Sequence, residues 1–524
     1  MTLVSPTPTP SRLSVTLSLF SRGQVRRPNN STASPPWAME HYSRIYFHPL
    51  RHVPGPFYAS ISSLFLYIIC YLGIEGHVLR SLHLRYGTPV LRVGPNSVSV
   101  SDSGALQEIY VSGGGFPKDS RYTNFDLGPV KSIFSSVDRE YRDHRAKAVA
   151  PLFAPSRIRS ACAPTEAIGK AITQFVHIIQ QFKNERISFD LVDVCARLSI
   201  DVVTAYLLDE PYGGLAEIGH LPPKAQARTK LSANPFIFAI VAFSRFSLFP
   251  KWLFSQLYKL SVRLSLTDEA KQSFRKLDIF ATKAVTRITS QKDPNNEYTY
   301  QSRLLAAGIS VSETTAQCKA ITFAGADSTA VMLATILFHL IRNPSARRTL
   351  VTEIEEHQKE SAGSFDPETI PYLRAVVKEG LRLGMANPTR LTRVVPKKTV
   401  LDVGGYSLPA GTVVGCAAYT LHHDPMVFSE PFEFRPERWL ESGREGSLTR
   451  PDMERNMMPF GVGLRACIGK NLALRQLYET VSAVLQMNVG GGLLEGAKVR
   501  QERIEIIEWF NGEIKGHCLD VDWE

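Results

Sequence analysis

The longest apolar pattern in the chain covers residues 310–344. Apolar residues occupy nearly every face of this segment, Ser310 and Glu313 at its start match a capping box, and Asn343 and Pro344 end it. A helix that is apolar on all faces lies either in the core of a large protein or in a membrane. Four residues argue against lipid surroundings: Lys319, Gly325, Asp327 and His339. We therefore expect a long central helix.

Other periodic patterns predict a protein made mainly of helices. They are mostly helical from about 135 to 355, and helices are also predicted over 371–384 and 472–485. Alternating apolar and polar residues around a Gly-Pro turn predict a β-hairpin at 88–102. Short strands and glycine turns are expected at 394–425. The predicted fold class is mainly α with a minor antiparallel β part.

One strongly polar segment and two strongly apolar segments stand out along the chain. Residues 1–36 are rich in Ser, Thr, Pro and Arg, so we expect a disordered segment, followed by a single domain over 37–524. Residues 61–74 form an apolar run of about 14 residues, fewer than the roughly 20 that span a bilayer. This run is either a helix at a membrane interface or a core helix. The aromatic-rich segment 235–254 is either core or an exposed lip that contacts membrane and apolar ligands.

Composition and charge narrow the functional classes. The 524 residues are 44% hydrophobic and 21% charged, which permits a large buried core. The net charge is +11, but there are no long Lys/Arg runs and no basic stripe with aromatic residues, so nucleic acid is not expected as a partner. An acidic protein or an anionic membrane surface fits better. The seven scattered cysteines include no C-x-x-C pair, which argues against a disulfide framework or a zinc site.

The stretch PFGVGLRACIGKNLA at 459–473 has two chemical interpretations. Gly461, Gly463 and Ala466 match a G-x-G-x-x-A dinucleotide-binding turn. That turn needs a strand before it and an acidic residue at the end of a second strand about twenty residues later. RNMMPF precedes the glycines, and the nearest acid, Glu479, lies within a predicted helix. The required context is missing.

The second interpretation is a metal thiolate. Cys467 lies at the predicted start of a helix, where free N–H groups stabilise a thiolate. Gly463 and Gly469 would let the backbone approach a flat ligand, and Arg465 could bind an anionic group at its edge. A single cysteine ligand without partner histidines suits haem iron better than zinc.

Three further motifs are ambiguous by themselves. AGADST at 324–329 could form a groove for a planar group beside the acid Asp327 and the alcohol Ser328, or could be a helix kink with a satisfied aspartate. In KEGLRL, Glu379 and Arg382 share a helix face, which usually indicates a solvated surface pair. Arg438 in FRPERW could join them in a network or lie in an ordinary turn.

In the order AGADST, KEGLR, FRPERW and FGVGLRACIG, the four motifs together resemble those of the cytochrome P-450 superfamily of haem-thiolate monooxygenases. The last motif matches the family's cysteine loop F-x-x-G-x-R-x-C-x-G at five positions: Phe460, Gly463, Arg465, Cys467 and Gly469. The likeness extends from about residue 45 to the C-terminus and is closest to membrane-associated fungal members of secondary metabolism. It implies the cytochrome P-450 fold, with a long central helix and a cysteine-ligand loop.

The resemblance also assigns roles to residues. Cys467 would be the axial ligand of the iron of haem b. Asp327 and Ser328, with Thr329 beside them, would relay protons, although the family usually has Thr where this chain has Ser328. The other assignments are a structural triad of Glu379, Arg382 and Arg438, and propionate-binding arginines at Arg393, Arg465 and either Arg142 or Arg145 in the haem-edge segment 140–153.

The activity implied by the resemblance is insertion of one oxygen atom of O2 into an apolar, terpenoid- or polyketide-like molecule. Electrons would come from NADPH through a separate cytochrome P-450 reductase, with cytochrome b5 as a second donor. The location implied is the cytosolic face of the endoplasmic reticulum membrane, with peripheral attachment because no clear N-terminal anchor is seen. Two alternatives stay open: a haem-thiolate isomerase or dehydratase that needs no NADPH, and a non-catalytic haem or lipid binder.

Overall fold

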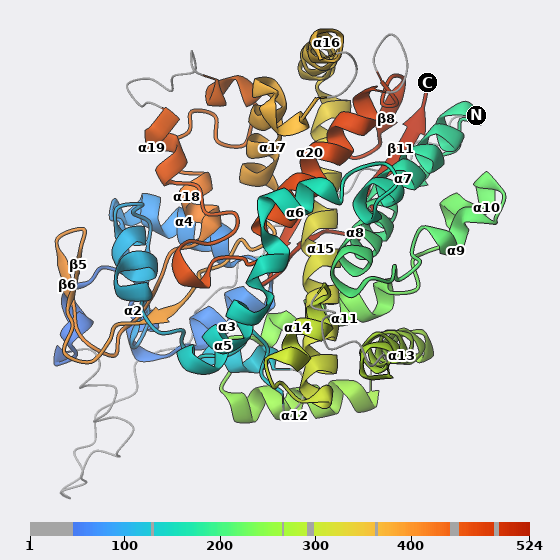
Figure 1. Cartoon of the computed structure of the whole chain (residues 1–524). Coiled ribbons are helices and arrows are strands. Elements are labelled where there is room, and N and C mark those ends of the chain that lie inside the picture. Colours follow the sequence, from blue (N-terminus) through green and yellow to red (C-terminus); the bar gives the residue numbers. More distant parts are fainter. Residues whose placement is uncertain are drawn as a thin grey trace, which may run out of the picture.

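The computed structural model describes residues 46–126, 130–264, 267–290, 298–361, 365–440, 450–486 and 492–524. The predicted disorder of residues 1–36 lies outside this part of the chain. Within it, helices gather around one long helix, α15 (Val311–Arg342), which runs through the middle of the molecule and is yellow in Figure 1. The mainly α fold class and the long central helix are confirmed.

Helix α15 begins and ends where the sequence predicts. The Ser310 side chain accepts a hydrogen bond from the Glu313 N–H at 3.3 Å, which forms half of the predicted capping box. The other half is absent, because the Glu313 carboxylate binds Arg145 and Tyr141 instead. Among the described residues, α15 is long and apolar enough to cross a membrane, but 67% of its most apolar window is buried inside the protein.

The helices that pack on α15 build the main core. Helix α8 (Leu191–Leu208) makes the most extensive contact with it, and α17 (Pro371–Gly384), α13 (Asp268–Ser290) and α20 (Lys470–Gln486) also pack against it. The helices predicted at 371–384 and 472–485 are confirmed. The other α-helices in the described ranges are α2 (Phe57–Ile61), α3 (Leu64–Tyr71), α4 (Glu75–Tyr86), α5 (Arg139–Val149), α6 (Pro155–Ser160), α7 (Ala167–Asn184), α9 (Ala216–Gly219), α10 (Pro223–Arg228), α11 (Asn234–Phe243), α12 (Lys251–Leu264), α14 (Tyr300–Ala306), α16 (Pro344–Glu360), α18 (Ala418–His422) and α19 (Arg450–Arg455).

The strands form small sheets. The predicted hairpin at 88–102 is present as β1 (Val90–Gly94) and β2 (Ser97–Val100), and it continues into a four-stranded sheet ordered β1-β2-β7-β4. In that sheet β2 pairs with β7 in parallel, whereas the other pairs are antiparallel. The other sheets are β3-β11-β8, β10-β9 and β5-β6. The remaining strand bounds are β3 (Phe189–Asp190), β4 (Arg393–Val394), β5 (Leu401–Val403), β6 (Tyr406–Leu408), β7 (Val413–Gly415), β8 (Ala497–Val499), β9 (Ile506–Glu508), β10 (Gly512–Ile514) and β11 (Asp520–Trp523).

The apolar run 61–74 contains helix α3, which has one buried and one exposed apolar face. Helix α3 buries Leu66 and Ile69 in a core cluster with strand β1. Its other face exposes large apolar side chains, among them Leu64 and Ile68. A one-sided helix of this kind is typical of an element between a protein core and a second apolar phase.

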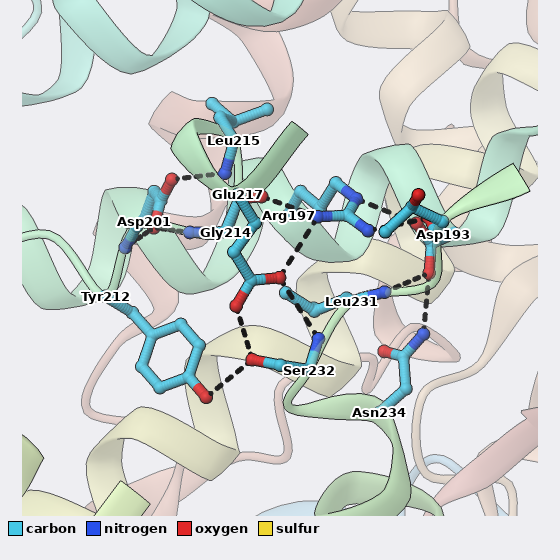
Figure 2. A network of polar contacts seen from close by, with 12 residues as sticks. Asp193, Arg197, Asp201, Tyr212, Gly214, Leu215, Glu217, Leu231, Ser232 and Asn234 are labelled. Carbon is cyan, nitrogen blue, oxygen red and sulfur yellow. Dashed lines mark hydrogen bonds and ion pairs between the residues drawn. The ribbon is translucent and has the colours of Figure 1, made fainter. Parts of the chain in front are cut away.

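Buried charges on α8 hold the connection from α8 to α11 in place (Figure 2). The Asp201 carboxylate accepts hydrogen bonds of 2.7–2.8 Å from three successive backbone N–H groups, at 213, 214 and 215. Arg197 donates to Asp193 at 2.8 Å and to the Gly214 carbonyl at 2.7 Å. The Asp193 carboxylate in turn accepts from the Asn234 side chain at 2.7 Å. These contacts fix the start of α11 against α8.

Candidate active site

The loop that carries Cys467 is a tight structure between Phe460 and α20. The Cys467 N–H donates to the Phe460 carbonyl at 2.8 Å, which closes the loop. Gly463 has a left-handed φ of 74°, and a Cβ there would overlap the carbonyl oxygen of Tyr110. The glycine therefore lets this loop lie against the backbone at Tyr110. Helix α20 begins at Lys470, three residues after the cysteine.

The thiol of Cys467 faces the interior and is also accessible. Its side chain is exposed to a water-sized probe. Burial nevertheless raises the pKa of the thiol, because protein atoms surround it, while the Gly469 N–H and the Lys470 charge act to lower it. A group that is both accessible and desolvated borders a space inside the protein. A bound metal ion would deprotonate such a thiol.

Gly469 adds to the evidence for a ligand at this space. Its φ is not left-handed, and a Cβ there would meet the Cys467 sulfur only at 3.8 Å, an ordinary contact. The protein atoms by themselves do not require a glycine at this position. A flat group seated on the sulfur would require one, as the sequence predicted.

A cluster of cations lies near the loop. Burial, and then the charge of Arg142, lower the pKa of Arg465 to about 10, with a further contribution from Arg393. Burial also lowers the pKa of Lys118 well below its ordinary value, and the charges of Arg393, Arg465 and Arg142 lower it further. Like charges are held together only when an anion or other compensation is available. This cluster therefore fits the acidic edge of a ligand.

Of the two candidate residues on α5, Arg142 is close enough to Arg465 and Lys118 for its charge to lower their pKa values, although its guanidinium also binds Asp143 at 2.9 Å. Arg145 lies elsewhere: its guanidinium binds the Glu313 carboxylate, with one contact of 3.0 Å, and stacks on the Tyr141 ring at 3.4 Å. An arginine whose donors are occupied in this way has little capacity left for a ligand. Arg142, whose guanidinium makes one bond to Asp143, keeps more donors for an anionic ligand than Arg145 does.

The AGADST segment presents different residues to different neighbours. Ala324 is exposed in the middle of a mostly buried helix, which fits the predicted groove for a planar group. Gly325 instead faces α8, where a Cβ would lie 2.5 Å from Val203. Asp327 accepts a hydrogen bond from the Asn511 side chain at 3.2 Å, and Ser328 is half-buried next to it. Thr329 is buried.

Asp327 has the electrostatic properties of a proton carrier. Burial raises the pKa of its carboxyl to about 7; the Asn511 hydrogen bond and the His517 charge act to lower it, and the Glu513 charge adds to the rise. A carboxyl with this pKa exchanges protons readily at neutral pH.

Glu379, Arg382 and Arg438 come together in one fully buried network. Arg382 binds the Glu379 carboxylate through two hydrogen bonds of 2.9 and 2.8 Å, and Arg438 adds one of 3.2 Å. The Trp439 indole N–H also donates to Glu379, at 2.8 Å. The solvated surface pair that an E-x-x-R spacing usually indicates is therefore not what the structure shows, because all three charged side chains have 0% exposure.

His422 connects this network to the cysteine loop. One ring nitrogen, Nδ1, lies 3.2 Å from the Arg382 carbonyl, and the other, Nε2, accepts from the Met458 N–H at 3.0 Å. Burial, and then the charge of Arg382, lower the pKa of His422 to about 3, so the ring is neutral. The neutral ring donates to Arg382 and accepts from Met458, two residues before Phe460.

Sequence reasoning did not single out six residues around the site: Tyr110, Lys118, His422, Asn511, Glu513 and His517. Their partners lie far along the chain, so local spacing carries no signal for them.

The fold and the cysteine loop together fit one class of protein: mainly helical enzymes that hold a flat metal cofactor through a thiolate. The comparison with known families agrees. The family model for cytochrome P-450 matches residues 64–487, and the chain belongs to this family. It is a haem-dependent monooxygenase, an oxidoreductase that inserts one oxygen atom of O2 into an apolar molecule.

Three of the similar proteins are fungal enzymes. The cytochrome P-450 monooxygenase mfmF of Annulohypoxylon moriforme is 60% identical over 92% of this chain and 96% of its own length. The cytochrome P-450 monooxygenase oblB of Aspergillus clavatus is 29% identical over 84% of this chain and 86% of its own length. A pisatin demethylase of Fusarium vanettenii is also 29% identical, over 84% and 85%.

Proposed function

We propose that Cys467 is the axial thiolate ligand of haem b iron in this monooxygenase. The observation that carries the proposal is the interior, accessible position of the Cys467 thiol, beside a glycine, Gly469, at which the surrounding protein atoms leave room for a Cβ. When bound, the haem supplies the activation of O2, and the thiolate favours cleavage of the O–O bond. The Cys467 loop holds the sulfur in place, because Gly463 seats it against Tyr110.

The cation cluster would hold the two propionates. Arg393, Arg465 and Arg142 supply guanidinium donors, and Lys118 supplies an ammonium group beside them. Propionates between these cations would relieve their mutual repulsion and raise the pKa of Lys118 toward its ordinary value. Arg145 has a different role in this proposal, because its bond to Glu313 fixes α5 to the start of α15.

Asp327 and Ser328 would deliver protons to the reaction that the bound haem supports. The Asp327 carboxyl holds a proton below pH about 7, and the Ser328 hydroxyl can accept that proton and pass one on. Serine keeps the hydroxyl of the family's threonine but lacks the methyl group that restrains its rotamer. Thr329 is buried behind them and shapes the helix face.

The substrate we propose is an apolar molecule of the terpenoid or polyketide-like kind, made in fungal secondary metabolism. Four aromatic side chains support this: Tyr122, Phe125, Phe134 and Phe510 pack with ring centroids 4.6–5.9 Å apart. Phe134 is still 45% exposed within this cluster, so part of its ring is available to a ligand. Such a surface binds the apolar part of a ligand and offers few hydrogen-bonding groups to orient it.

The electron donor we propose is an NADPH-dependent cytochrome P-450 reductase, with cytochrome b5 as a second donor. The surface hollow on α5 is balanced in charge, because Arg139 and Lys147 line it together with Glu140 and Asp143. The support is the net charge of +11, which makes the protein surface basic overall. An acidic partner would be steered toward such a surface. The proposed location is the cytosolic face of the endoplasmic reticulum membrane, with α3 at the lipid surface.

The ligand assignment can be tested with one substitution. The reduced Cys467→Ser protein should lose the red-shifted Soret band that carbon monoxide gives with a haem thiolate. Cys518→Ser is the matched control, since Cys518 is also a partly accessible free cysteine, and it should keep the band. A red-shifted band in Cys467→Ser would overturn the assignment.

A further inference from the structure

A small cavity lies beside Asp327, where the hairpin of β9 and β10 packs against α15. Its volume is about 30 Å3, which has room for about two water molecules at roughly 10–15 Å3 each. Most of its lining is apolar. The polar lining residues are Asp193, Asn234, Asp327, Glu513 and His517.

Glu513 and His517 connect this cavity to solvent. The Glu513 side chain is 8% exposed, and its Oε1 pairs with His517 Nε2 at 3.0 Å. The other oxygen, Oε2, is buried and has no protein partner among the described residues. The His517 side chain is 33% exposed, so its ring reaches the surface. A water molecule in the cavity would satisfy the unpaired oxygen of Glu513.

Of the titratable groups around Asp327, one carboxylate is placed to pass protons to it through the cavity. Glu513 and His517 are on the hairpin, and Asp193 is on α8, whereas α11 contributes Asn234 and apolar side chains to the cavity. Asp193 is bound to Arg197 at 2.8 Å, so its charge is compensated and its oxygens are occupied. Of the carboxylates that line the cavity, Glu513 has an oxygen available for water.

We propose that His517, Glu513 and the water-sized cavity form the route by which protons from solvent reach Asp327. Solvent protonates His517 at Nδ1, the imidazolium gives its Nε2 proton to Glu513 Oε1, and the neutral ring then returns to its starting tautomer by proton exchange with solvent. Glu513 then passes a proton through water in the cavity to the Asp327 carboxylate. Each transfer moves one proton and no electrons. The route rests on the proposed function, in which Asp327 supplies protons to the reaction.

Proton exchange at Asp327 itself provides the test. The infrared C=O stretch of the protonated Asp327 carboxyl is identified in the ferric protein as the band that Asp327→Asn loses. After rapid mixing into deuterated buffer below pH 7, this band shifts as the carboxyl exchanges its proton. We expect Glu513→Gln and His517→Gln to slow the shift about tenfold or more. Glu513→Gln should also lower the pKa of Asp327, because it removes a negative charge that raises it.

Glu505→Gln is the matched control. Glu505 lies just before β9 on the same hairpin and pairs with Lys515 at 2.8 Å, so removing its charge changes the hairpin surface but not the cavity. It should leave the exchange rate unchanged. Wild-type exchange in both route variants, or equal slowing in the Glu505→Gln control, would overturn the proposal.

The same variants also separate this proposal from the proposed function. Exchange at Asp327 is measured without substrate or reductase, so it reports the route whatever reaction the enzyme carries out. In the complete system, the route variants should release more hydrogen peroxide per NADPH oxidised, with the carbon monoxide band intact. Slowed exchange without increased peroxide release would support the route and count against Asp327 as the proton donor in turnover.

Discussion

Gly463 shows how one backbone contact sets the position of the cysteine loop. Its φ is 74°, and a Cβ would overlap the Tyr110 carbonyl oxygen, which cannot move away without shifting its own segment. Gly411 has a similar φ of 85°, but a Cβ there would have no neighbour within 4 Å among the described residues. Alanine substitutions at the two glycines therefore distinguish the free-energy cost of a left-handed backbone conformation from the cost of the clash with Tyr110.

We expect Gly411→Ala to lower the free energy of unfolding by about 1 kcal/mol, the cost of a left-handed alanine. Gly463→Ala should lower it by clearly more and should also reduce the carbon monoxide band, because the loop must move from Tyr110. Urea titration and the reduced spectrum of both purified variants measure the two effects. Equal losses of stability would show that the contact with Tyr110 does not matter.

At the scale of elements, Gly325 sets how closely α15 approaches α8. A Cβ at this position would lie 2.5 Å from Val203 on α8, so the glycine serves the helix contact and not the ligand groove. Gly325→Ala should lower the free energy of unfolding by about 1–3 kcal/mol through overpacking, less the gain in helix propensity. The double variant Gly325→Ala/Val203→Ala should recover part of the loss, as thermal unfolding can measure. If Val203→Ala recovered none of the stability lost in Gly325→Ala, the strain would not come from the contact between these two residues.

The sequence predicts those elements best that carry their own boundary signals. The ends of α15 and α17 lie within about two residues of the expected ends, because caps and prolines mark them. The 394–425 segment was less well predicted: β5, β6 and β7 are present, but the short helix α18 follows them. Tertiary contacts decide whether so short a segment forms a helix or a strand. The positions of glycines and the alternation of apolar and polar residues therefore do not distinguish the two.

Parts of the site that depend on contacts between distant segments could not be read from the sequence. An E-x-x-R spacing is the same for a surface pair and for the buried Glu379–Arg382 pair, and only the packing of α17 against Trp439 distinguishes them. Likewise, Arg142 and Arg145 lie on one short helix, and the position of Glu313 on α15 determines which of them stays near Arg465. Cys467 was predictable, because its loop has a local sequence signature.

At the scale of the whole molecule, two apolar segments that are far apart in sequence lie side by side. Tyr67 and Tyr71 on α3 contact Phe249 and Phe246, with ring centroids 4.9 and 5.7 Å apart. The segment at 235–254, expected as either core or exposed lip, thus borders the exposed face of α3. Trp252, three residues beyond Phe249, is 69% exposed. Together these residues give the molecule an apolar surface.

We expect this apolar surface to bind membranes. Ile68 and Leu72 are 49% and 55% exposed on and just after α3, and transfer of such side chains into lipid contributes about 1.5–3 kcal/mol each when burial is complete. The double variant Ile68→Ser/Leu72→Ser should weaken binding of the full chain to phosphatidylcholine–phosphatidylserine vesicles about tenfold or more in flotation assays. Val400→Ser/Met426→Gln, which removes side chains that are 53% and 80% exposed elsewhere, should bind as the wild type does. Added salt should weaken binding of both variants alike, because the net charge of +11 is unchanged. If both double variants bound equally, α3 would not be the membrane contact.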